Sequence, residues 1–388
     1  MNVEALSRVQ PAIDLCAEFI GQRRTIVNVD ESTKIKGPDA ARTLAVIELA
    51  KRAYARRIAT GLVAPRSPMD LFSQFEFLDY RILGFKSFYA FRSRYAIMVK
   101  QQFGKFKRGE GGRVLTDGSG VALREGPLIN TIVGYRNPEE LHDKIAPYSY
   151  RVLKENCLDL PPKIYLPPRD VDLTDEQRRV LKDLKNTAQA QLSSGAYVTA
   201  TQKMTMLLRM HQVLCGHVVD EDETVHTIPS NRTNELLEVL EECQGKVIIW
   251  SGFIYSIKEI INALSKEYGP ESVVHFYGAT KARDRMLASQ RFQEDPACRF
   301  IVSNQQTGGM GNTWHAASLV VHYSNTHNLE DRLQSEDRAH RDGLDHPVAY
   351  VDLQATENNF ERKLIEALRK KLDIATIISG DSYREWII

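Results

Sequence analysis

The sequence predicts an α/β protein in which parallel sheets are covered by helices on both faces. From residue 230 onward, short runs rich in Val, Ile and Phe alternate with longer stretches of helical period. Strands that alternate with helices imply a parallel sheet with helices packed on each side. Hydrophobic side chains make up 43% of the 388 residues and charged ones 26%, which is typical of a globular protein with a substantial core. This length allows two to three compact units.

The first 80 residues are expected to form the end of one α/β unit. Strands are expected at 25–29 and 57–60, and helices at 38–54 and 68–78. The β-branched run of the first strand is typical of a buried parallel strand.

This first strand ends in an acidic pair, Asp30 and Glu31. Parallel strands of α/β proteins commonly carry chemical groups at their carboxyl ends. An aspartate there can hold Mg²⁺ through water, and a glutamate beside it can orient or deprotonate an attacking water. The plainer alternative is that the two residues only form a turn.

The next region is basic and aromatic. Between residues 81 and 125, ten Lys or Arg residues stand against three acidic residues, and seven aromatic residues are interleaved with them. Such a composition is typical of a surface that binds phosphates and stacks bases, with Lys105, Lys107 and Arg108 as candidate contacts. Alternatively, residues 85–100 form an amphipathic helix whose aromatic side chains belong to the core. Both interpretations can hold on different faces.

Two helices and an alternating region are expected after this insertion. Leu173-Thr-Asp-Glu-Gln177 is expected to start a helix with Thr174 as its N-cap, and a second helix is expected at 199–214. From residue 230 the predicted helices are 233–243, 255–267, 280–293, 329–341 and 356–371. The predicted strands are 246–250, 272–276, 300–302, 318–322 and 347–352.

The segment Gln334-Ser-Glu-Asp-Arg-Ala-His-Arg341 places Gln334, Arg338 and Arg341 at i, i+4 and i+7. Within the helix expected at 329–341, these side chains share one face. Arginine is always charged and forks onto phosphate oxygens, so two guanidiniums here suit a surface that closes over a triphosphate. The alternative is a solvated charged helix.

The motifs around this segment resemble motifs V and VI of the Swi/Snf-type branch of superfamily-two helicases and translocases. The matching run contains Thr307-Gly-Gly-Met-Gly311, the strand-like Ala316–His322, Asn325 and residues 334–341. The chain departs from the motif at residues 312–314, where Asn-Thr-Trp stands in place of the usual Asn-Leu pair.

Upstream segments are similar to earlier motifs of the same family, in the family's order. Asp30-Glu-Ser-Thr-Lys-Ile-Lys36 resembles its Walker B box. Arg57–Gly61 with Ser67–Phe72 resembles motif III, although residues 62–63 replace a Thr-Pro pair and Arg66 stands where a small polar residue is common.

The resemblance implies RecA-like helicase lobes with parallel sheets, an incomplete first lobe and a complete C-terminal lobe, joined by a helical and basic insertion. The expected boundaries are 1–80 for the end of the first lobe, 81–225 for the insertion, 226–372 for the second lobe and 373–388 for a tail. It also implies ATP hydrolysis with Mg²⁺ and movement on double-stranded DNA. The residues implied for catalysis are Asp30, Glu31, Gln334, Arg338 and Arg341. Asp30 is also the implied Mg²⁺ ligand, and ATP binding is implied for Asp30, Gly309 and Gly311. Contacts to DNA are implied for Ser251, Gly278, Thr280 and Thr307.

No Gly-x-x-x-x-Gly-Lys-(Ser/Thr) phosphate loop occurs in the sequence. Met1–Ser7 resembles motif Ib, an internal segment of the first lobe, so we expect the chain to begin partway through that lobe. One hypothesis is a split or truncated helicase completed by a separate polypeptide that supplies the phosphate loop. Another is a catalytically inactive DNA-binding remnant. A nucleic-acid-binding module of another class would require the ordered motifs to be coincidence.

Charge, cysteine spacing and hydropathy indicate which partners, metal sites and compartments to expect. The net charge is +1, so no overall basic field indicates nucleic acid. The five cysteines show no paired spacing and are expected to be reduced structural thiols; Cys215 and His217 lack a second pair that would indicate a metal site. No signal peptide or long apolar run occurs, so no membrane partner is expected. The run from Asp30 to Phe91 also resembles bacteriophage helicases of this branch, which implies the cytoplasm of a host cell.

Overall fold

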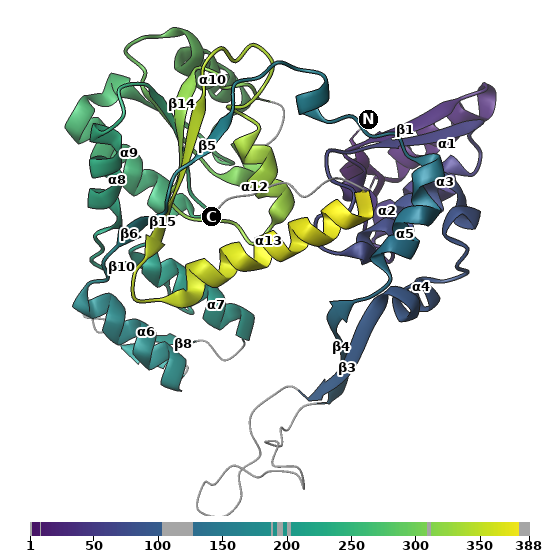
Figure 1. Ribbon diagram of the computed structural model, residues 1–388, viewed down its shortest axis with the longest axis horizontal. Helices are drawn as coiled ribbons and strands as arrows, with labels where there is room; N and C mark the ends of the chain where they lie inside the picture. The colour runs from purple at the N-terminus through teal and green to yellow at the C-terminus, as the bar shows by residue number, and fades with distance from the viewer. Residues whose placement is uncertain are drawn as a thin grey trace, which may run out of the picture. The chain divides into compact units, whose positions relative to one another are not determined.

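The computed structural model describes residues 2–7, 9–102, 127–187, 189–191, 197–199, 203–308 and 312–379. The chain is grouped into two compact units, each with its own hydrophobic clusters (Figure 1). Unit 1 comprises Met1–Tyr150 and Lys371–Arg384, and unit 2 comprises Arg151–Lys370 and Glu385–Ile388. Among the helices described, none has the length and apolar character needed to cross a bilayer.

Unit 2 is built around a sheet with the strand order β12-β13-β11-β14-β15-β5, in which each strand pair is parallel. A further strand, β6, pairs in parallel with β15 beyond the end of β5. The strands are β5 (Lys163–Tyr165), β6 (Arg169–Val171), β11 (Lys246–Trp250), β12 (Val273–Phe276), β13 (Phe300–Ser303), β14 (Ala317–His322) and β15 (Val348–Ala355). The expected α/β class with a parallel sheet is confirmed.

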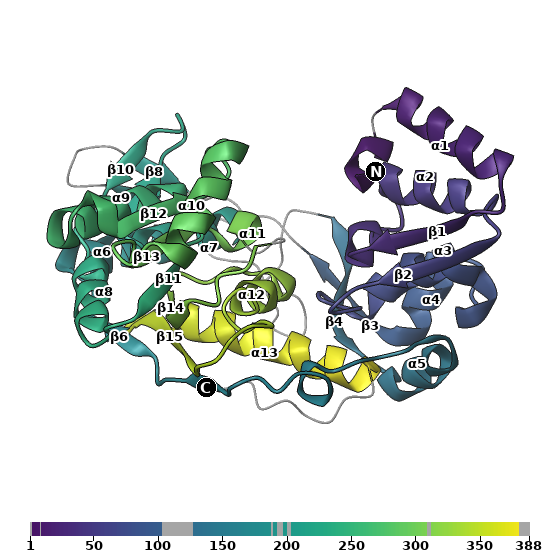
Figure 2. The same cartoon turned by 90° about the horizontal axis from the view of Figure 1, so that it is seen from above.

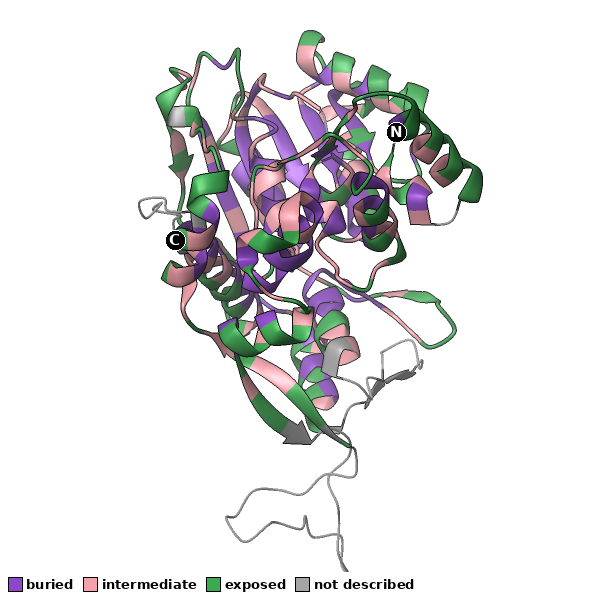
Figure 3. Ribbon diagram, turned by 90° about the vertical axis from the view of Figure 1, so that its right-hand side faces the viewer, coloured by how far each residue is buried: buried purple, intermediate pink, exposed green. Residues whose placement is uncertain are grey.

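Helices cover both faces of this sheet (Figure 2). The helices of unit 2 are α6 (Asp175–Thr187), α7 (Lys203–Leu214), α8 (Arg232–Glu241), α9 (Ile254–Tyr268), α10 (Ala282–Glu294), α11 (Gln305–Gly308), α12 (Leu329–Glu336) and the first part of α13 (Asn359–Ser379). Side chains alternate along β11 because successive residues of a strand point to opposite faces. Val247 and Ile249 pack with α8 and α9, whereas Ile248 and Trp250 pack with α10. The buried residues therefore gather in the strand layer, as Figure 3 shows.

The helices α6 and α7 form a smaller cluster beside the hairpin of β9 (His217–Val219) and β10 (Val225–Thr227). The Thr174 amide donates to Gln177 Oε1 at 3.0 Å, and the Gln177 amide donates to Thr174 Oγ1 at 3.3 Å. This reciprocal pair is a capping box, so the predicted N-cap is confirmed. A second short hairpin, β7 (Gln189–Gln191) with β8 (Tyr197–Thr199), follows α6.

Unit 1 contains a parallel pair, β1 (Ile26–Asp30) and β2 (Ala55–Ala59), and an antiparallel hairpin, β3 (Ala96–Gln102) and β4 (Leu128–Tyr135). Its helices are α1 (Gln10–Gln22), α2 (Ala41–Ala50), α3 (Leu71–Leu83), α4 (Phe88–Tyr95) and α5 (Pro138–Ile145). The last residues of α13 belong to this unit, where Ile378 is fully buried and its carbonyl lies 2.9 Å from His142 Nδ1.

Three expected helices were clearly too long. The helix expected at 38–54 is α2, Ala41–Ala50. The helix expected at 85–100 is only α4, because β-branched residues from Ala96 onward pair with β4 and the Tyr95 carbonyl accepts from the Arg136 amide. The aromatic residues of this region mostly belong to the core, as the second interpretation held: Phe91 and Tyr95 are fully buried. Tyr89 is the exposed exception, packed under the Arg92 guanidinium.

The helix expected at 329–341 ends at Glu336, with Asp337 as its C-cap. Gln334 therefore lies in the last turn of α12, whereas Arg338 and Arg341 follow the helix. The expected sharing of one helical face by these three residues is wrong, although the structure still brings the two arginines together.

Candidate functional site

The acidic pair lies at the carboxyl end of β1. Asp30 is exposed, and its Oδ1 accepts a hydrogen bond from the Glu31 amide at 3.0 Å. Glu31 has φ 50° and ψ 57°, which is the left-handed region. A residue other than glycine at such angles carries a conformational cost on the order of 1 kcal/mol, and such residues cluster at functional sites. The backbone thus turns sharply where the sequence predicts chemistry.

Gln74 of α3 connects this turn to the segment that resembles motif III. The fully buried Gln74 accepts a hydrogen bond from Ser32 Oγ at 2.6 Å. Its Nε2 donates to the carbonyls of Val63 and Asp70, both at 2.8 Å. One amide group therefore joins the end of β1, the turn after β2 and the start of α3.

Arg66, which departs from the motif, forms an ion pair inside it. Its Nη2 and Nε donate to Asp70 Oδ1 at 2.7 and 3.0 Å, and its backbone amide donates to Asp70 Oδ2 at 2.9 Å. Asp70 is buried. The arginine closes this turn through both its side chain and its backbone.

The DNA-binding candidates of unit 2 lie at the carboxyl ends of parallel strands. Ser251 follows β11 and is fully buried, with its Oγ 3.3 Å from Ser324 Oγ after β14. Gly278 follows β12, and a Cβ built on it would lie 3.9 Å from Oγ1 of Thr307, which follows β13. The structure therefore brings Gly278 and Thr307 together, and it places Ser251 beneath the surface.

Thr280 does not cap α10. The helix begins after Lys281, and no side chain caps its N-terminus. Instead, Thr280 Oγ1 accepts from the Tyr277 amide at 3.4 Å, and the Thr280 amide donates to the Tyr277 carbonyl at 2.9 Å. The threonine closes a turn, because a short hydroxyl side chain competes for nearby backbone groups.

Gly308 is held against the core. A Cβ at this position would lie 2.3 Å from Ser303 Oγ and 2.7 Å from the Trp250 ring. Only glycine allows the backbone this close approach. Of the other expected site residues, Gly309, Gly311, Lys105, Lys107 and Arg108 lie outside the described residues.

The two arginines converge on one backbone carbonyl. Arg338 Nη1 donates to the Asn312 carbonyl at 2.8 Å, and Arg341 Nη1 donates to the same oxygen at 3.2 Å. Arg338 Nε also donates to the Gln334 carbonyl at 3.0 Å. The Trp314 amide in turn donates to the Arg338 carbonyl at 2.9 Å. The segments that resemble motifs V and VI are thus bonded to each other in both directions.

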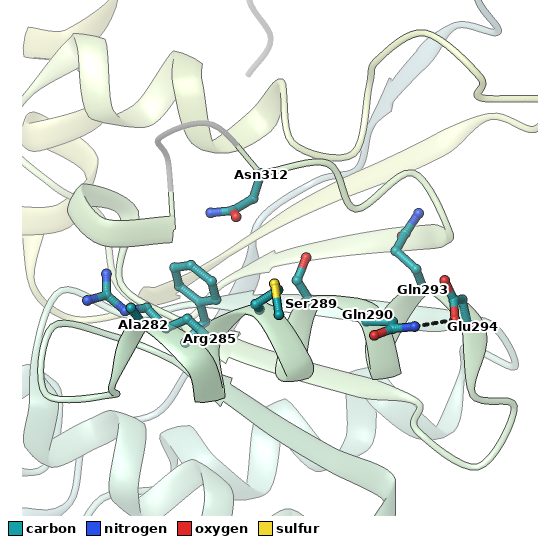
Figure 4. A pocket seen from close by; sticks show the side chains of 9 residues that line it. Ala282, Arg285, Ser289, Gln290, Gln293, Glu294 and Asn312 are labelled. Carbon is teal, nitrogen blue, oxygen red and sulfur yellow. Dashed lines mark hydrogen bonds between the residues drawn. The ribbon is translucent and has the colours of Figure 1, made fainter.

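A cavity of about 520 Å³ lies along α10 beside Asn312 (Figure 4). Its polar groups contact the segment after Asn312 and the turn before α10. Ser289 Oγ accepts from Trp314 Nε1 at 2.9 Å, and Gln293 Oε1 accepts from the Ala316 amide at 3.1 Å. Arg285 Nε donates to the Thr280 carbonyl at 2.8 Å. The first two contacts hold the residues just after Asn312, where the arginines bind.

The sequence did not single out Arg332, a buried arginine near this site. It bonds to Asn325, Glu336 and Asp352. The Arg332–Glu336 spacing of i, i+4 was the available signal, but exposed helices show the same spacing.

The described residues hold no group of three or more His, Cys, Asp or Glu side chains arranged for a metal ion. Mg²⁺ does not need such a group, because it is usually bound by one or two carboxylates and keeps several waters. Asp30 alone can therefore serve as its protein ligand. The exposed carboxylate at the end of β1 offers such an oxygen donor.

Several known proteins are similar to this chain in sequence. Residues 231–343 match the family "Helicase conserved C-terminal domain". The TATA-binding protein-associated factor MOT1 of Saccharomyces cerevisiae is 24% identical over 90% of this chain and 20% of its own length. The DNA annealing helicase and endonuclease ZRANB3 of Mus musculus is 24% identical over 83% of the chain and 27% of its own length. The chain thus spans about a fifth to a quarter of these relatives.

Solved structures of related proteins are also similar. The Sulfolobus solfataricus SWI2/SNF2 ATPase core in complex with dsDNA is 23% identical, with a TM-score of 0.42 over 95% of this chain and 72% of that one. The C-terminal part of the Fun30 ATPase domain is 16% identical, with a TM-score of 0.42 over 57% of this chain and 98% of that one. Residues 231–343 are thus similar to a helicase C-terminal domain, and the curated relatives include the ATP-dependent helicase FUN30 of Saccharomyces cerevisiae, 24% identical over 51% of this chain and 18% of its own length.

Proposed function

We propose that this chain is part of an ATP-dependent DNA translocase of the Swi/Snf type, which hydrolyses ATP to move on double-stranded DNA. The observation that carries the proposal is the convergence of Arg338 and Arg341 on the Asn312 carbonyl. Two guanidiniums held at one point can neutralise the charge that develops on a transferring phosphoryl group. The helicase domain match covers both arginines and Asn312.

The acidic pair has the complementary role in this proposal. Asp30 would hold Mg²⁺, which supplies positive charge to the phosphate oxygens when bound. Glu31 would orient or deprotonate the attacking water from the sharp left-handed turn at the end of β1. Gly309 and Gly311 would contact the nucleotide through their backbone. That the acidic pair and the arginines act on one nucleotide stays a prediction.

Double-stranded DNA would contact the strand ends of unit 2. Gly278 and Thr307 are adjacent there, and backbone groups at such turns bind phosphates without reading sequence. Ser251 would act by supporting this edge through Ser324. Lys105, Lys107 and Arg108 would add phosphate contacts from the basic insertion.

The phosphate loop has no counterpart in these 388 residues. We therefore propose that a polypeptide segment outside them supplies the groups that bind the β- and γ-phosphates. Glu31, Gln334, Arg338 and Arg341 would complete the site from this chain.

ATP hydrolysis by the purified chain, measured with and without double-stranded DNA, tests the proposal. The assay is repeated with the product of the adjoining upstream reading frame added. DNA-stimulated hydrolysis that depends on the added polypeptide is the expected result. DNA binding without hydrolysis in every mixture would favour the inactive remnant, and the absence of both would refute the proposal.

A further inference from the structure

We propose that Arg332 is a positioning residue, which holds Arg338 and Arg341 in place through a charge-balanced ionic cluster with Arg332 and Glu336 buried at its centre. Their catalytic use rests on the function proposed above. The cluster itself is a feature of unit 2 and can be tested without ATP hydrolysis.

Arg332 is only 3% exposed and uses its guanidinium in three directions. Nη1 and Nη2 donate to the two carboxylate oxygens of Asp352 at 2.6 and 3.1 Å. Nε donates to Glu336 Oε1 at 2.9 Å, and Nη1 also donates to Asn325 Oδ1. Asn325 Nδ2 donates to Asp352 at 2.7 Å. One side chain thus joins α12 to Asp352 within β15 and to Asn325 in the segment after β14.

The cluster continues from Glu336 and Asp337 to the edge of the sheet. Glu336 Oε2 accepts from the Tyr165 hydroxyl at 2.9 Å and lies 3.4 Å from Lys163 Nζ. Asp337 pairs with Lys163 at 3.3 Å and with Lys154 at 2.9 Å. Three cations, Arg332, Lys163 and Lys154, therefore meet three carboxylates, those of Glu336, Asp337 and Asp352. Nearby cations hold the pKa of each carboxyl below its usual value despite burial, to about 2 for Asp352.

The backbone transmits this anchoring to the arginines. The Glu336 carbonyl accepts from the Tyr350 hydroxyl at 3.0 Å and from the His340 amide at 3.4 Å. The Arg338 amide donates to the Ser335 carbonyl at 3.3 Å, directly after the last turn of α12. Because α12 ends at Glu336, residues 338–341 are held by individual contacts. Besides those of Glu336, the Trp314 amide donates to the Arg338 carbonyl, Lys154 Nζ donates to the His340 carbonyl at 3.3 Å, and His340 Nε2 lies 2.8 Å from the Pro161 carbonyl. Lys154 belongs to the same ionic cluster.

The structure also explains why the geometry requires arginine. A planar guanidinium can bind Asp352 in a bidentate way and reach Glu336 with its remaining N–H group, whereas a lysine ammonium is a point charge on a flexible stem. Removing the cation leaves the buried Glu336 carboxylate and the half-buried Asp352 carboxylate without it, which is strongly unfavourable. The response is therefore expected to be local movement of α12 and the residues after it.

Hydrogen exchange measured by mass spectrometry on the whole chain tests the proposal, with Arg332→Met as the variant. Arg232→Met is the matched control, because Arg232 is also buried and its Nη2 donates to both oxygens of one carboxylate, that of Glu361. In Arg332→Met the amides of residues 333–341 should exchange at least tenfold faster, while peptides of α8 change little. Arg232→Met should show the reverse pattern.

The proposal is wrong if residues 333–341 exchange at the same rate in Arg332→Met and in the unchanged protein. It is also wrong if both variants accelerate exchange there equally, since Arg332 would then only stabilise unit 2 as a whole. Arg332→Lys, which keeps the charge but not the fork, should give an intermediate exchange rate.

A second measurement joins the cluster to function. In the mixture that hydrolyses ATP, Arg332→Met should lower kcat at least tenfold and change KM by less than threefold. The reason is that Arg338 and Arg341 would stabilise the phosphoryl group mainly in the transition state, so their displacement lowers the rate more than it weakens ATP binding. Arg332→Lys should recover part of kcat. Faster hydrogen exchange with an unchanged kcat would show that Arg332 anchors residues 333–341, and it would refute the role of this anchoring in catalysis. If no mixture hydrolyses ATP, the proposed function fails, and the exchange data still decide whether Arg332 anchors residues 338–341.

Discussion

At the scale of single residues, Arg338 and Arg341 differ in their surroundings although they share one acceptor. Arg338 is buried and bonded to two backbone carbonyls, whereas Arg341 is exposed. We expect Arg341→Ala to leave the fold intact and to lower DNA-stimulated ATP hydrolysis by about 10³–10⁵-fold, the usual effect of losing an arginine finger. Initial rates of phosphate release in the active mixture measure this.

Arg338→Ala should cause a similar loss together with a lower urea midpoint, because it also removes two hydrogen bonds inside unit 2. The control is Arg178→Ala, an exposed arginine of unit 2 that pairs with Glu357. This control should change neither the rate nor the midpoint appreciably. Arg341→Ala with most of its turnover retained would exclude Arg341 from catalysis.

Gly308 gives a second prediction at this scale. A methyl group at this position would overlap Ser303 Oγ and the Trp250 ring, and neither side chain can move freely in the core. Gly308→Ala should therefore destabilise unit 2 by about 1–3 kcal/mol, as overpacked cores do. Gly252→Ala is the matched control, because its new Cβ would meet Ser324 Oγ at an ordinary 3.6 Å. Urea unfolding followed by circular dichroism compares them, and equal midpoints would contradict the close packing.

At the scale of elements, Gln74 joins β1, α3 and the turn between β2 and α3. Gln74→Leu keeps most of the volume but leaves the Ser32 hydroxyl and the carbonyls of Val63 and Asp70 without this partner. We expect a loss of about 1–3 kcal/mol in the free energy of unfolding of unit 1. Gln22→Leu is the control, since Gln22 is exposed and bonds only to Glu18 in its own helix. A loss no larger than in this control would show that the link contributes little.

The elements that sequence patterns predicted well are those in which one physical signal dominates. The continuous apolar run of β11 was predicted with the observed bounds, because a strand buried on both faces needs no polar alternation. The Thr174 cap was also predictable, since its partner Gln177 lies three residues away. For β11 the deciding signal is the apolar composition of the strand itself. For Thr174 it is a contact between residues close in sequence.

The elements that failed depend on distant partners. The helical pattern of residues 329–341 continues past Glu336, but Trp314 and Tyr350 bind the backbone there and end α12. Likewise, Ala96–Gln102 becomes a strand because it pairs with β4. The site shows the same division: Gln334, Arg338 and Arg341 are visible as a motif, whereas Arg332 is distinguished only by burial against Asp352, twenty residues away in the sequence.

At the scale of the whole molecule, unit 2 contains three buried histidines that should make its stability depend on pH. Burial lowers the pKa of His211 and His322 from the usual 6.5 to about 3, and that of His217 to about 4. Among the described residues, neither ring nitrogen of His322 has a hydrogen-bond partner. These rings are therefore neutral in the folded protein and become protonated mainly when it unfolds.

The sign of the effect follows from the direction of these shifts. Because the folded pKa lies below the unfolded one, the contribution to stability is complete above about pH 6.5 and is lost as pH falls from there toward 3 to 4. Each histidine can contribute up to about 1.4 kcal/mol per pH unit within this window. The carboxylates of the ionic cluster add to the loss only near their own, lower pKa values, as for Asp352 at about 2. Between pH 7 and 5, the histidines should therefore dominate.

Urea midpoints of unit 2 between pH 7.5 and 5 measure this dependence. His211→Phe is the informative variant, because His211 already packs against the rings of Phe253 and Phe360 and a phenyl ring suits the same space. The free energy of unfolding of the variant should fall less steeply with pH, and the difference should be the contribution of one histidine, up to about 1.4 kcal/mol per pH unit. A midpoint independent of pH in this range would mean that the three rings reach water or a partner in the folded state. Equal slopes for the variant and the unchanged protein would show that His211 does not contribute to the pH dependence, and would leave the contributions of His217 and His322 untouched.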